Sequence, residues 1–223
     1  MIHVISKYNR HLYENILDEM FKLRHDIFVG ERGWINLAKS DGRDRDQFDT
    51  EDTIYFLKLD PDMKVLGGMR MYPTTIDTQL NTIFKHTCVL QSQPVDPKHW
   101  EWSRYFIAEP RYRSAAGKPV HYELYTAILE YALEVGIKSL SGFIETSIFV
   151  QSGKMPWDMR QLGIPMEYGG KDGEPLGYGL PIQLMIDRDT VRKTKIAWRM
   201  VKPCLSLSLG EESPYRETGF RPR

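Results

Sequence analysis

The stretch Trp100-Glu101-Trp102-Ser103-Arg104-Tyr105-Phe106-Ile107 decides the fold, because it has the composition of a buried strand yet carries one carboxylate and one guanidinium. An unpaired charge among such residues is strongly unfavourable. We therefore expect Glu101 and Arg104 to meet partners or a substrate, and this strand is the candidate active site. Residues three apart on a regular strand point to opposite faces, so a shared pocket requires a strong twist or a bulge between them.

A basic loop and a helix follow this strand. The loop over 109–117 combines arginines with small residues. It leads into a helix predicted over 118–136, with Pro119 in the first turn and Gly136 as its stop. A loop of this kind at a helix N-terminus is a natural site for an anion such as a pyrophosphate. An apolar strand is predicted next, over 137–144.

The remaining predicted elements complete an α/β pattern. They are a strand over 2–5, a helix over 10–28 capped by Asn9, hairpin strands over 54–59 and 65–72, short helices over 76–86 (Ile83 and Phe84 inward) and 146–151, a turn of structure over 157–162, a strand over 181–186 and a helix over 190–200. This order favours one mixed sheet flanked by helices, as in N-acetyltransferase-like acyltransferases. We expect one domain over 1–201 and a loosely ordered tail over 202–223.

Composition argues against several classes of function. Lys+Arg and Asp+Glu both total 30, so no overall field attracts nucleic acid or an anionic membrane. Cys88 and Cys204 lack metal or disulfide spacing, which favours reduced thiols in a cytoplasmic protein. No stretch approaches the ~20 apolar residues of a membrane span. We expect no metal, no nucleic-acid partner and no membrane.

The apolar row of the helix over 10–28 passes through Arg24 to Phe28. Arg24 either lies on the core and reaches water, or faces a pocket and pairs with a carboxylate. The polar segment over 29–52 is too long for a plain connection, and Trp34 within it argues against disorder. Its aspartates form either a solvated face or a site for an ammonium or sulfonium ligand.

Rare residue types recur in a fixed order along the first half of the chain: Arg24, Phe28, Gly33-Trp34, Gly42, Asp46, Asp49, Arg70, Phe84 and Trp100-Glu101-x-Ser103-Arg104. In this order and spacing the chain resembles the acyl-homoserine lactone synthases, the autoinducer synthases of the LuxI type. The second half resembles that family more weakly, chiefly in the helix over 118–136, the strand over 139–145 and the turn over 162–165.

The resemblance implies an N-acetyltransferase-like fold and a quorum-sensing signal synthase. Such an enzyme acylates the amine of S-adenosylmethionine from an acyl thioester, closes the methionine part to a homoserine lactone and releases methylthioadenosine. Both reactants are substrates, so no cofactor is expected. The implied S-adenosylmethionine pocket contains Arg24, Phe28, Trp34, Asp46, Asp49 and Arg104, with Arg70 tying the acidic loop to the sheet. The implied acyl pocket contains Phe84, Ser103, Gly142, Ile144 and Thr146.

Glu101 and Arg104 are the candidate catalytic residues. An amine must be neutral to attack a thioester, so Glu101 either accepts a proton directly or through water, with a pKa raised by its surroundings, or mainly positions the substrate. Backbone N–H groups over 105–107 are candidate oxyanion donors. Arg104 or Arg24 would hold the substrate carboxylate, with Phe28 and Trp34 beside the sulfonium. The structural alternatives are core packing for Trp34 and Phe84, and an ion pair between Arg70 and Asp49.

The acyl donor is either acyl-coenzyme A or acyl carrier protein, and oligomeric state stays open. The run Met71-Tyr72-Pro73-Thr74-Thr75 and the pair Glu145-Thr146 resemble the coenzyme A-using subgroup that makes branched or aromatic homoserine lactones, although the residues after that pair differ. Gly142 stands near the position where synthases of 3-oxo products often carry threonine, which predicts an acyl group without that substituent. The alternative functions are an N-acyltransferase for another amine and a non-catalytic binder of S-adenosylmethionine or an acyl signal.

Overall fold

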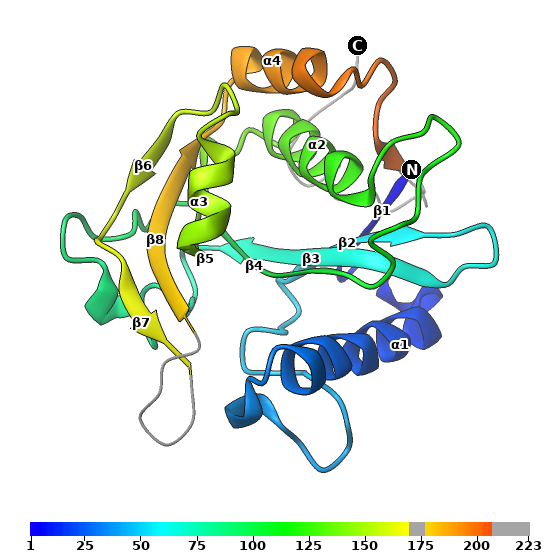
Figure 1. Cartoon of the computed structure of the whole chain (residues 1–223), viewed down its shortest axis with the longest axis horizontal. Helices are drawn as coiled ribbons and strands as arrows, with labels where there is room; N and C mark the ends of the chain where they lie inside the picture. Colours follow the sequence, from blue (N-terminus) through cyan, green and yellow to red (C-terminus); the bar gives the residue numbers. More distant parts are fainter. Residues whose placement is uncertain (170–176, 207–223) are drawn as a thin grey trace.

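The computed structural model describes residues 1–169 and 177–206, which form one nine-stranded mixed sheet with helices on both faces (Figure 1). The strands are β1 Ile2–Ile5, β2 Ile54–Leu59, β3 Val65–Pro73, β4 His99–Ile107, β5 Ser139–Glu145, β6 Met159–Gln161, β7 Met166–Tyr168, β8 Gly177–Met185 and β9 Leu205–Ser206. Their order is β6-β8-β5-β4-β3-β2-β1-β9, and β7 also pairs with β8. The pairs β4–β5 and β1–β9 are parallel, and the others are antiparallel.

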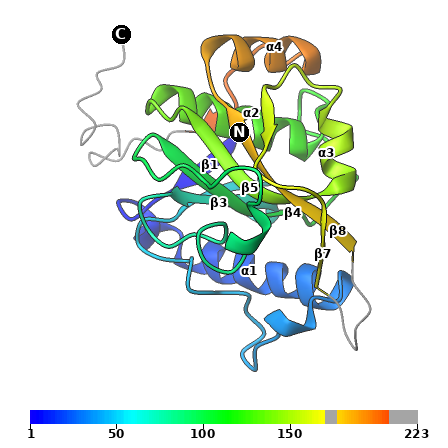
Figure 2. The same cartoon turned by 90° about the vertical axis from the view of Figure 1, so that its left-hand side faces the viewer.

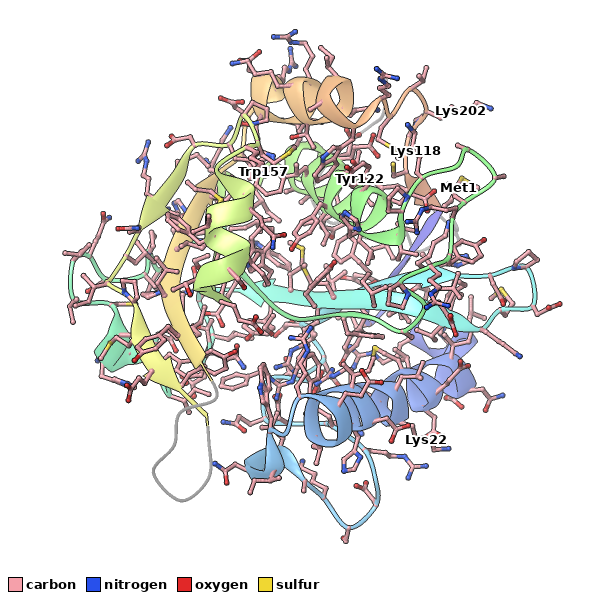
Figure 3. The ribbon with its side chains drawn as sticks, in the orientation of Figure 1. Met1, Lys22, Lys118, Tyr122, Trp157 and Lys202 are labelled. Carbon is pink, nitrogen blue, oxygen red and sulfur yellow. The ribbon has the colours of Figure 1, made fainter. Side chains whose placement is uncertain are left out.

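The helices divide between the two faces of the sheet. The helix α1 (Glu14–His25) covers one face, whereas α2 (Val120–Glu134) and α4 (Arg188–Trp198) cover the other (Figures 1 and 2). Figure 3 shows the same division, with Lys22 of α1 and Tyr122 of α2 on opposite sides. The short helix α3 (Thr146–Ser152) follows β5 directly. The larger core cluster lies between α2 and the sheet, and a smaller one lies under α1.

Helix boundaries in the second half follow from local chemistry. Pro119 occupies the N-cap position of α2, and Gly136 follows its C-cap with φ +81°, a conformation that glycine adopts without strain. Asp187 caps α4 by accepting a hydrogen bond from the Thr190 amide at 2.6 Å. These features confirm the helix predicted after the basic loop and the helix predicted near the C-terminus.

The N-terminal helix differs from its prediction over 10–28. A 3-10 turn over Arg10–Leu12 precedes α1, and a π-helical turn over Asp26–Glu31 follows it. Asn9 does not cap a helix through its side chain. Its amide instead accepts from the Ser6 N–H and donates to the Val4 carbonyl, which ties the chain to the end of β1.

The helix predicted over 76–86 is wrong. The segment consists of turns followed by a 3-10 turn over Lys85–Thr87, and Ile83 is half exposed rather than inward. The turn expected over 157–162 contains the strand β6. Of the expected tail, residues 202–206 are described, and β9 within them pairs with β1. The rest, 207–223, lies outside the described residues.

The strands β4 and β5 separate after a short parallel contact. They pair only from His99↔Ser139 to Glu101↔Ser141, whereas β5 continues to pair with β8 as far as Glu145. The rest of β4 therefore has no neighbour in β5. The two parallel strands therefore separate in the middle of the sheet, beyond Glu101 and Ser141.

The strand β4 bulges at Arg104, which is the distortion expected between Glu101 and Arg104, although Glu101 does not share the cavity that Arg104 lines. Arg70 of β3 lies opposite Ser103 but Gly68 lies opposite Phe106, so β4 contains one extra residue there. Arg104 has φ +54°, an uncommon conformation for a residue with a side chain. On the other side of β3, Gly68 lets the Leu57 side chain of β2 lie close to its backbone. A Cβ at residue 68 would lie 2.5 Å from a Leu57 methyl group.

Candidate active site

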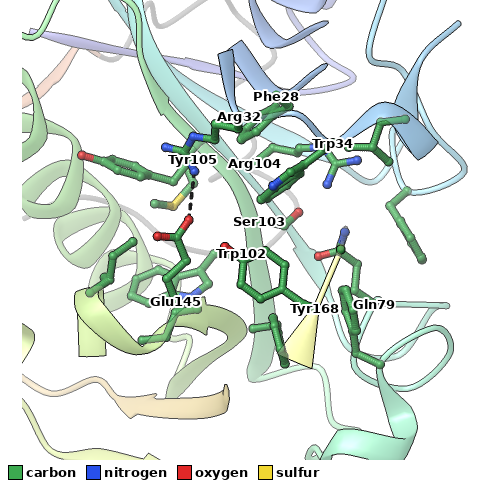
Figure 4. A pocket seen from close by; sticks show the side chains of 18 of the residues that line it. Phe28, Arg32, Trp34, Gln79, Trp102, Ser103, Arg104, Tyr105, Glu145 and Tyr168 are labelled. Atoms are coloured by element: carbon green, nitrogen blue, oxygen red, sulfur yellow. Dashed lines mark hydrogen bonds and ion pairs between the residues drawn. The ribbon is translucent and has the colours of Figure 1, made fainter. Parts of the chain in front are cut away.

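A cavity of about 360 Å³ lies where β4 and β5 separate (Figure 4). Phe28 and Trp34 line it from the α1 face, and Trp102, Tyr105 and Tyr125 line it from the α2 face. Other lining residues include Arg32, Asp46, Gln79, Phe84, Ser103, Arg104, Ile144, Glu145, Trp157, Met159 and Tyr168. The cavity thus connects an aromatic region carrying charged groups with a mainly apolar region across the sheet.

Three arginines and three aspartates form a buried network beside the cavity. Asp44 binds Arg24 and Arg104, Asp49 binds Arg24 and Arg70, and Asp46 binds Arg70 and Arg104, all at N···O distances of 2.7–3.0 Å. The three positive and three negative charges of this network balance one another. All three aspartates are therefore paired with arginines. Arg24 pairs with carboxylates, which was one of its two predicted roles, and does not reach water from the core.

Within this network only Asp46 and Arg104 reach the cavity. Arg24, Asp49 and Arg70, which the resemblance placed at the S-adenosylmethionine pocket or its support, lie behind it and hold these two in place. Burial alone would raise the pKa of Asp44, but Arg24 and Arg104 outweigh it and lower that pKa. The Asp44 carboxylate therefore stays ionised near neutral pH.

An aromatic wall stands next to Arg104. Phe28 stacks on Trp34 with ring centroids 5.0 Å apart, and the Arg104 guanidinium carbon lies 5.5 Å from the Phe28 centroid. Tyr168 meets Trp34 edge to face at 5.9 Å. Faces of aromatic rings attract cations and flat ring systems. Both Phe28 and Trp34 were predicted as site residues, whereas nothing in the turn-rich segment pointed to Tyr168.

Glu101 is fully buried and does not line the cavity. Its Oε1 accepts from the Tyr72 hydroxyl and the Gln79 N–H, both at 2.9 Å. Its Oε2 accepts from the Leu80 N–H at 3.0 Å and the Gln93 amide at 2.7 Å. Burial raises the pKa of Glu101, although the hydrogen bonds from Leu80, Gln93 and Tyr72 oppose part of the rise. A bound amine in the cavity would not touch this carboxylate directly.

An ion pair crosses the cavity. Arg32 Nη1 lies 3.3 Å from Glu145 Oε1, and the two residues belong to the segment after α1 and to the end of β5 (Figure 4). The Arg32 guanidinium also lies 5.3 Å from the Phe28 centroid. Burial and the nearby Glu145 raise the pKa of Tyr168 to about 12. No local pattern predicts that Arg32 reaches Glu145, since 113 positions separate them.

The residues predicted for the acyl pocket divide into two groups. Phe84, Ser103 and Ile144 line the cavity, and Phe84 stacks on Phe143 at 4.6 Å. Gly142 and Thr146 do not line it. Gly142 lies beneath the Trp102 indole, and the Thr146 hydroxyl donates to the Tyr178 carbonyl.

Several aromatic residues on the α2 side were not predicted: Trp102, Tyr105, Tyr125 and Trp157 line the cavity. Strand alternation could have placed Trp102 on the face opposite Glu101 and Ser103. Tyr125 and Trp157 come from α2 and from the segment before β6, so no local pattern assigns them to a site.

A mixed sheet that splits between parallel strands, with a cavity joining a charged aromatic region to an apolar one, is typical of the N-acetyltransferase-like class of fold. Comparisons with known proteins narrow this class. The family model described as autoinducer synthase matches residues 8–172. The chain therefore belongs to the autoinducer synthase family.

Similar proteins come from the same family. An isovaleryl-homoserine lactone synthase from Bradyrhizobium diazoefficiens is 42% identical over 165 residues, which cover 74% of this chain and 73% of that protein. The solved structure of a coenzyme A-dependent acyl-homoserine lactone synthase, BjaI, with S-adenosylmethionine and isopentyl-coenzyme A has a TM-score of 0.80 and 36% identity, covering 91% of both chains. A second coenzyme A-dependent synthase, MesI, has a TM-score of 0.79 and 27% identity, covering 93% of this chain and all of that one. Among the described residues, no helix is long and apolar enough to cross a membrane.

Proposed function

We propose that this chain makes an acyl-homoserine lactone from S-adenosylmethionine and an acyl-coenzyme A with a short branched or aromatic acyl group. The observation that carries the proposal is the cavity through the split between β4 and β5, which reaches both faces of the sheet. Two substrates can enter such a cavity from opposite sides and meet at its centre. The coenzyme A-dependent relatives support the choice of donor.

S-adenosylmethionine fits the α1 side. In the described part of the chain, Arg104 uses Nε and Nη2 to bind Asp44 and Asp46, and no residue there bonds to its Nη1. We assign this remaining donor to the substrate carboxylate. Phe28 and Trp34 are placed to contact the sulfonium and the adenine.

The acyl group fits the α2 side. Trp102, Tyr125 and Trp157 close this side with large rings, which favours a short chain over a long one. The relatives named for isovaleryl and isopentyl groups agree with that limit. Trp102 also covers Gly142, where a threonine would serve 3-oxo substrates, so we propose an acyl group without a 3-oxo substituent.

The reaction has two bond exchanges. The neutral amine attacks the thioester carbonyl, the C–S bond breaks, and coenzyme A leaves with the electron pair. The carboxylate oxygen of the same substrate then attacks its γ-carbon and expels methylthioadenosine. Beyond Glu101, β4 makes no strand hydrogen bonds to β5, so N–H groups on that edge of β4 are left to bind a ligand. We therefore take the backbone N–H groups over 105–107 as candidate donors to the tetrahedral oxyanion.

The phosphates of coenzyme A are assigned to the basic loop that precedes α2. This loop carries Arg111, Arg113 and Lys118 and ends at the helix N-terminus, where backbone N–H groups lack helical partners. We place residues 1–201 in one catalytic domain. The thiols of Cys88 and Cys204 are free, in keeping with action in the cytoplasm.

The test is a donor panel. The pure chain is incubated with S-adenosylmethionine and either acyl-coenzyme A or acyl carrier protein thioesters of varied length and branching, and methylthioadenosine release is measured. We expect the highest kcat/KM with isovaleryl-coenzyme A or a similar donor. No release with any donor would refute the function, whereas thiol release without methylthioadenosine would indicate transfer to another amine.

A further inference from the structure

A chain of hydrogen bonds links buried Glu101 to the cavity. The Tyr72 hydroxyl donates to Glu101 Oε1 at 2.9 Å, and Tyr72 Oη lies 3.3 Å from Ser103 Oγ. Arg70 Nε donates to the same Ser103 oxygen at 2.9 Å. Glu101 and Tyr72 are fully buried, whereas Ser103 lines the cavity. Ser103 is therefore the point at which this buried chain meets a bound substrate.

The chemistry of the partners determines the direction of each proton. Glu101 accepts from two donors at each carboxylate oxygen, so it is held as an acceptor and the Tyr72 proton points to it. With that proton committed, Tyr72 Oη accepts from the Ser103 hydroxyl. Arg70 has only donors and occupies one lone pair of Ser103 Oγ. The second lone pair of Ser103 remains for a donor in the cavity.

We propose that Ser103 and Tyr72 carry a proton from the attacking amine to Glu101, so that Glu101 is the base of the acylation without touching the substrate. This inference rests on the proposed function, because it requires an amine and a thioester in the cavity. Ser103 is the group that meets the amine, and Tyr72 is a positioning residue that transmits the proton. The bulge at Arg104 keeps Ser103 and Arg104 facing the same ligand.

The proton transfer balances along the chain. As the N–C bond forms, the amine N–H proton moves to Ser103 Oγ, the Ser103 proton moves to Tyr72 Oη, and the Tyr72 proton moves to Glu101 Oε1. Both hydroxyl groups are regenerated and Glu101 becomes neutral. The C–S electron pair leaves on the coenzyme A sulfur, which takes up a proton when Glu101 releases its own by the reverse path.

A purely structural role is the competing explanation. The bonds from Gln79, Leu80 and Gln93 to Glu101 also hold the segment over 76–93 against β4, which would account for a buried glutamate without catalysis. Glu145 is a second competitor, because it is the glutamate that lines the cavity itself in the described part of the chain. A structural role affects stability, whereas a relay affects kcat and its pH dependence.

The experiment compares Tyr72→Phe, Ser103→Ala, Ser103→Thr, Glu101→Gln and the double variant Tyr72→Phe/Glu101→Gln in the full chain. Tyr13→Phe is the matched control, since it also removes a buried phenol hydroxyl, one bound to His3 at 3.0 Å and remote from the cavity. Methylthioadenosine release gives kcat and KM across pH in H2O and D2O. Thermal unfolding of each variant reports stability.

The relay predicts a fall in kcat of about 100-fold or more for Tyr72→Phe, Ser103→Ala and Glu101→Gln. It predicts KM for S-adenosylmethionine within about twofold of wild type, since uniform binding is unchanged. The double variant should be no slower than the slower single variant, because the residues act as a unit. Ser103→Thr should keep most of the activity by retaining the hydroxyl, and Tyr13→Phe should match wild type.

The acid limb of the pH profile should disappear in Tyr72→Phe, and the wild-type solvent isotope effect should involve more than one proton. A wild-type kcat and pH profile in Tyr72→Phe would overturn the relay, as would loss of the acid limb in Glu145→Gln but not in Glu101→Gln. If Tyr72→Phe unfolds, equal activity of Ser103→Ala and Ser103→Thr overturns it. Wild-type protein that releases no methylthioadenosine would instead refute the proposed function itself.

Discussion

The indole of Trp102 lies directly against the backbone of Gly142: a Cβ at residue 142 would be 2.3 Å from the indole Cδ1 atom. The contact joins β4 to β5 on the α2 side, next to the point where the two strands separate. A side chain at residue 142 would therefore overlap the space that the Trp102 indole fills. Trp102 lines the α2 side of the cavity, and the absence of a side chain at residue 142 is what lets the indole lie there.

Gly142→Ala should therefore destabilise the fold and impair catalysis. Overpacking of this kind costs about 1–3 kcal/mol of unfolding free energy, because Trp102 or the strand must shift. Urea unfolding followed by fluorescence measures it. Gly30→Ala is the matched control, since beyond the adjoining backbone nothing lies within 4 Å of a Cβ at that position. Equal stability of both variants would show that Trp102 moves away without cost.

Arg32→Ala should leave stability nearly unchanged and weaken substrate binding. The Arg32 and Glu145 side chains are each 35% exposed, and exposed pairs contribute only about 0.2–1 kcal/mol. The pair nevertheless crosses the cavity, so its loss should raise KM for the acyl donor several-fold with little change in kcat. Steady-state kinetics checks this, with Arg160→Ala, which breaks an exposed pair with Asp158, as control. An unchanged KM would contradict a role for the pair in shaping the cavity.

Asp44→Asn should be among the most destabilising conservative changes in the chain. It leaves Arg24 and Arg104 without a shared carboxylate in a buried network. Breaking a buried pair by removing one partner costs about 3–5 kcal/mol. Guanidinium unfolding measures the difference, and Asp158→Asn, in the exposed pair with Arg160, should differ from wild type by less than about 1 kcal/mol. Similar losses for both would indicate that the network is solvated.

Acid should destabilise the fold through the same network. Burial alone would raise the pKa of Asp49, but Arg24 and Arg70 lower it, and the pKa of Asp44 is lowered as well. Because the folded pKa values lie below the unfolded ones, their stabilisation is complete above about pH 4 and is lost as pH falls toward the folded values. The free energy of unfolding should drop steeply below about pH 4. A flat profile down to about pH 2 would contradict the ion-pair account.

Arg104→Lys should weaken S-adenosylmethionine binding while keeping a positive charge. Lysine lacks the planar fork that binds two aspartates and still offers a donor to the cavity. We expect Kd for S-adenosylmethionine to rise by about tenfold or more. Titration calorimetry measures it, and Lys22→Arg on the outer face of α1 serves as the control. Unchanged affinity would show that a residue other than Arg104 binds the substrate carboxylate.

Sequence patterns predicted the parts of the fold that local chemistry determines. Two strand-like, mostly apolar runs and the turn over 60–62 were sufficient for the hairpin of β2 and β3. The start of the first helix was missed because the Asn9 amide binds Ser6 and Val4 instead of capping a helix. The mismatch is a competition between two local hydrogen-bonding arrangements, which spacing alone does not resolve.

The candidate site was predictable where the family pattern lies on one strand. Of the residues predicted on this strand, Ser103 and Arg104 line the cavity, and the bulge expected between Glu101 and Arg104 is present. Arg32 and Tyr125 were missed because the fold brings them to the cavity from segments far apart in the chain. The separation of Glu101 from the cavity was also unforeseen, since one-dimensional spacing does not reveal that the segment over 76–93 covers it.

The most direct test of the central claim is the mass of the product formed from isovaleryl-coenzyme A and S-adenosylmethionine labelled with carbon-13 in its methionine backbone. The account predicts labelled isovaleryl-homoserine lactone, formed in equal amounts with coenzyme A thiol and methylthioadenosine. Free coenzyme A without a labelled lactone, from this donor and from the rest of the panel, would contradict it.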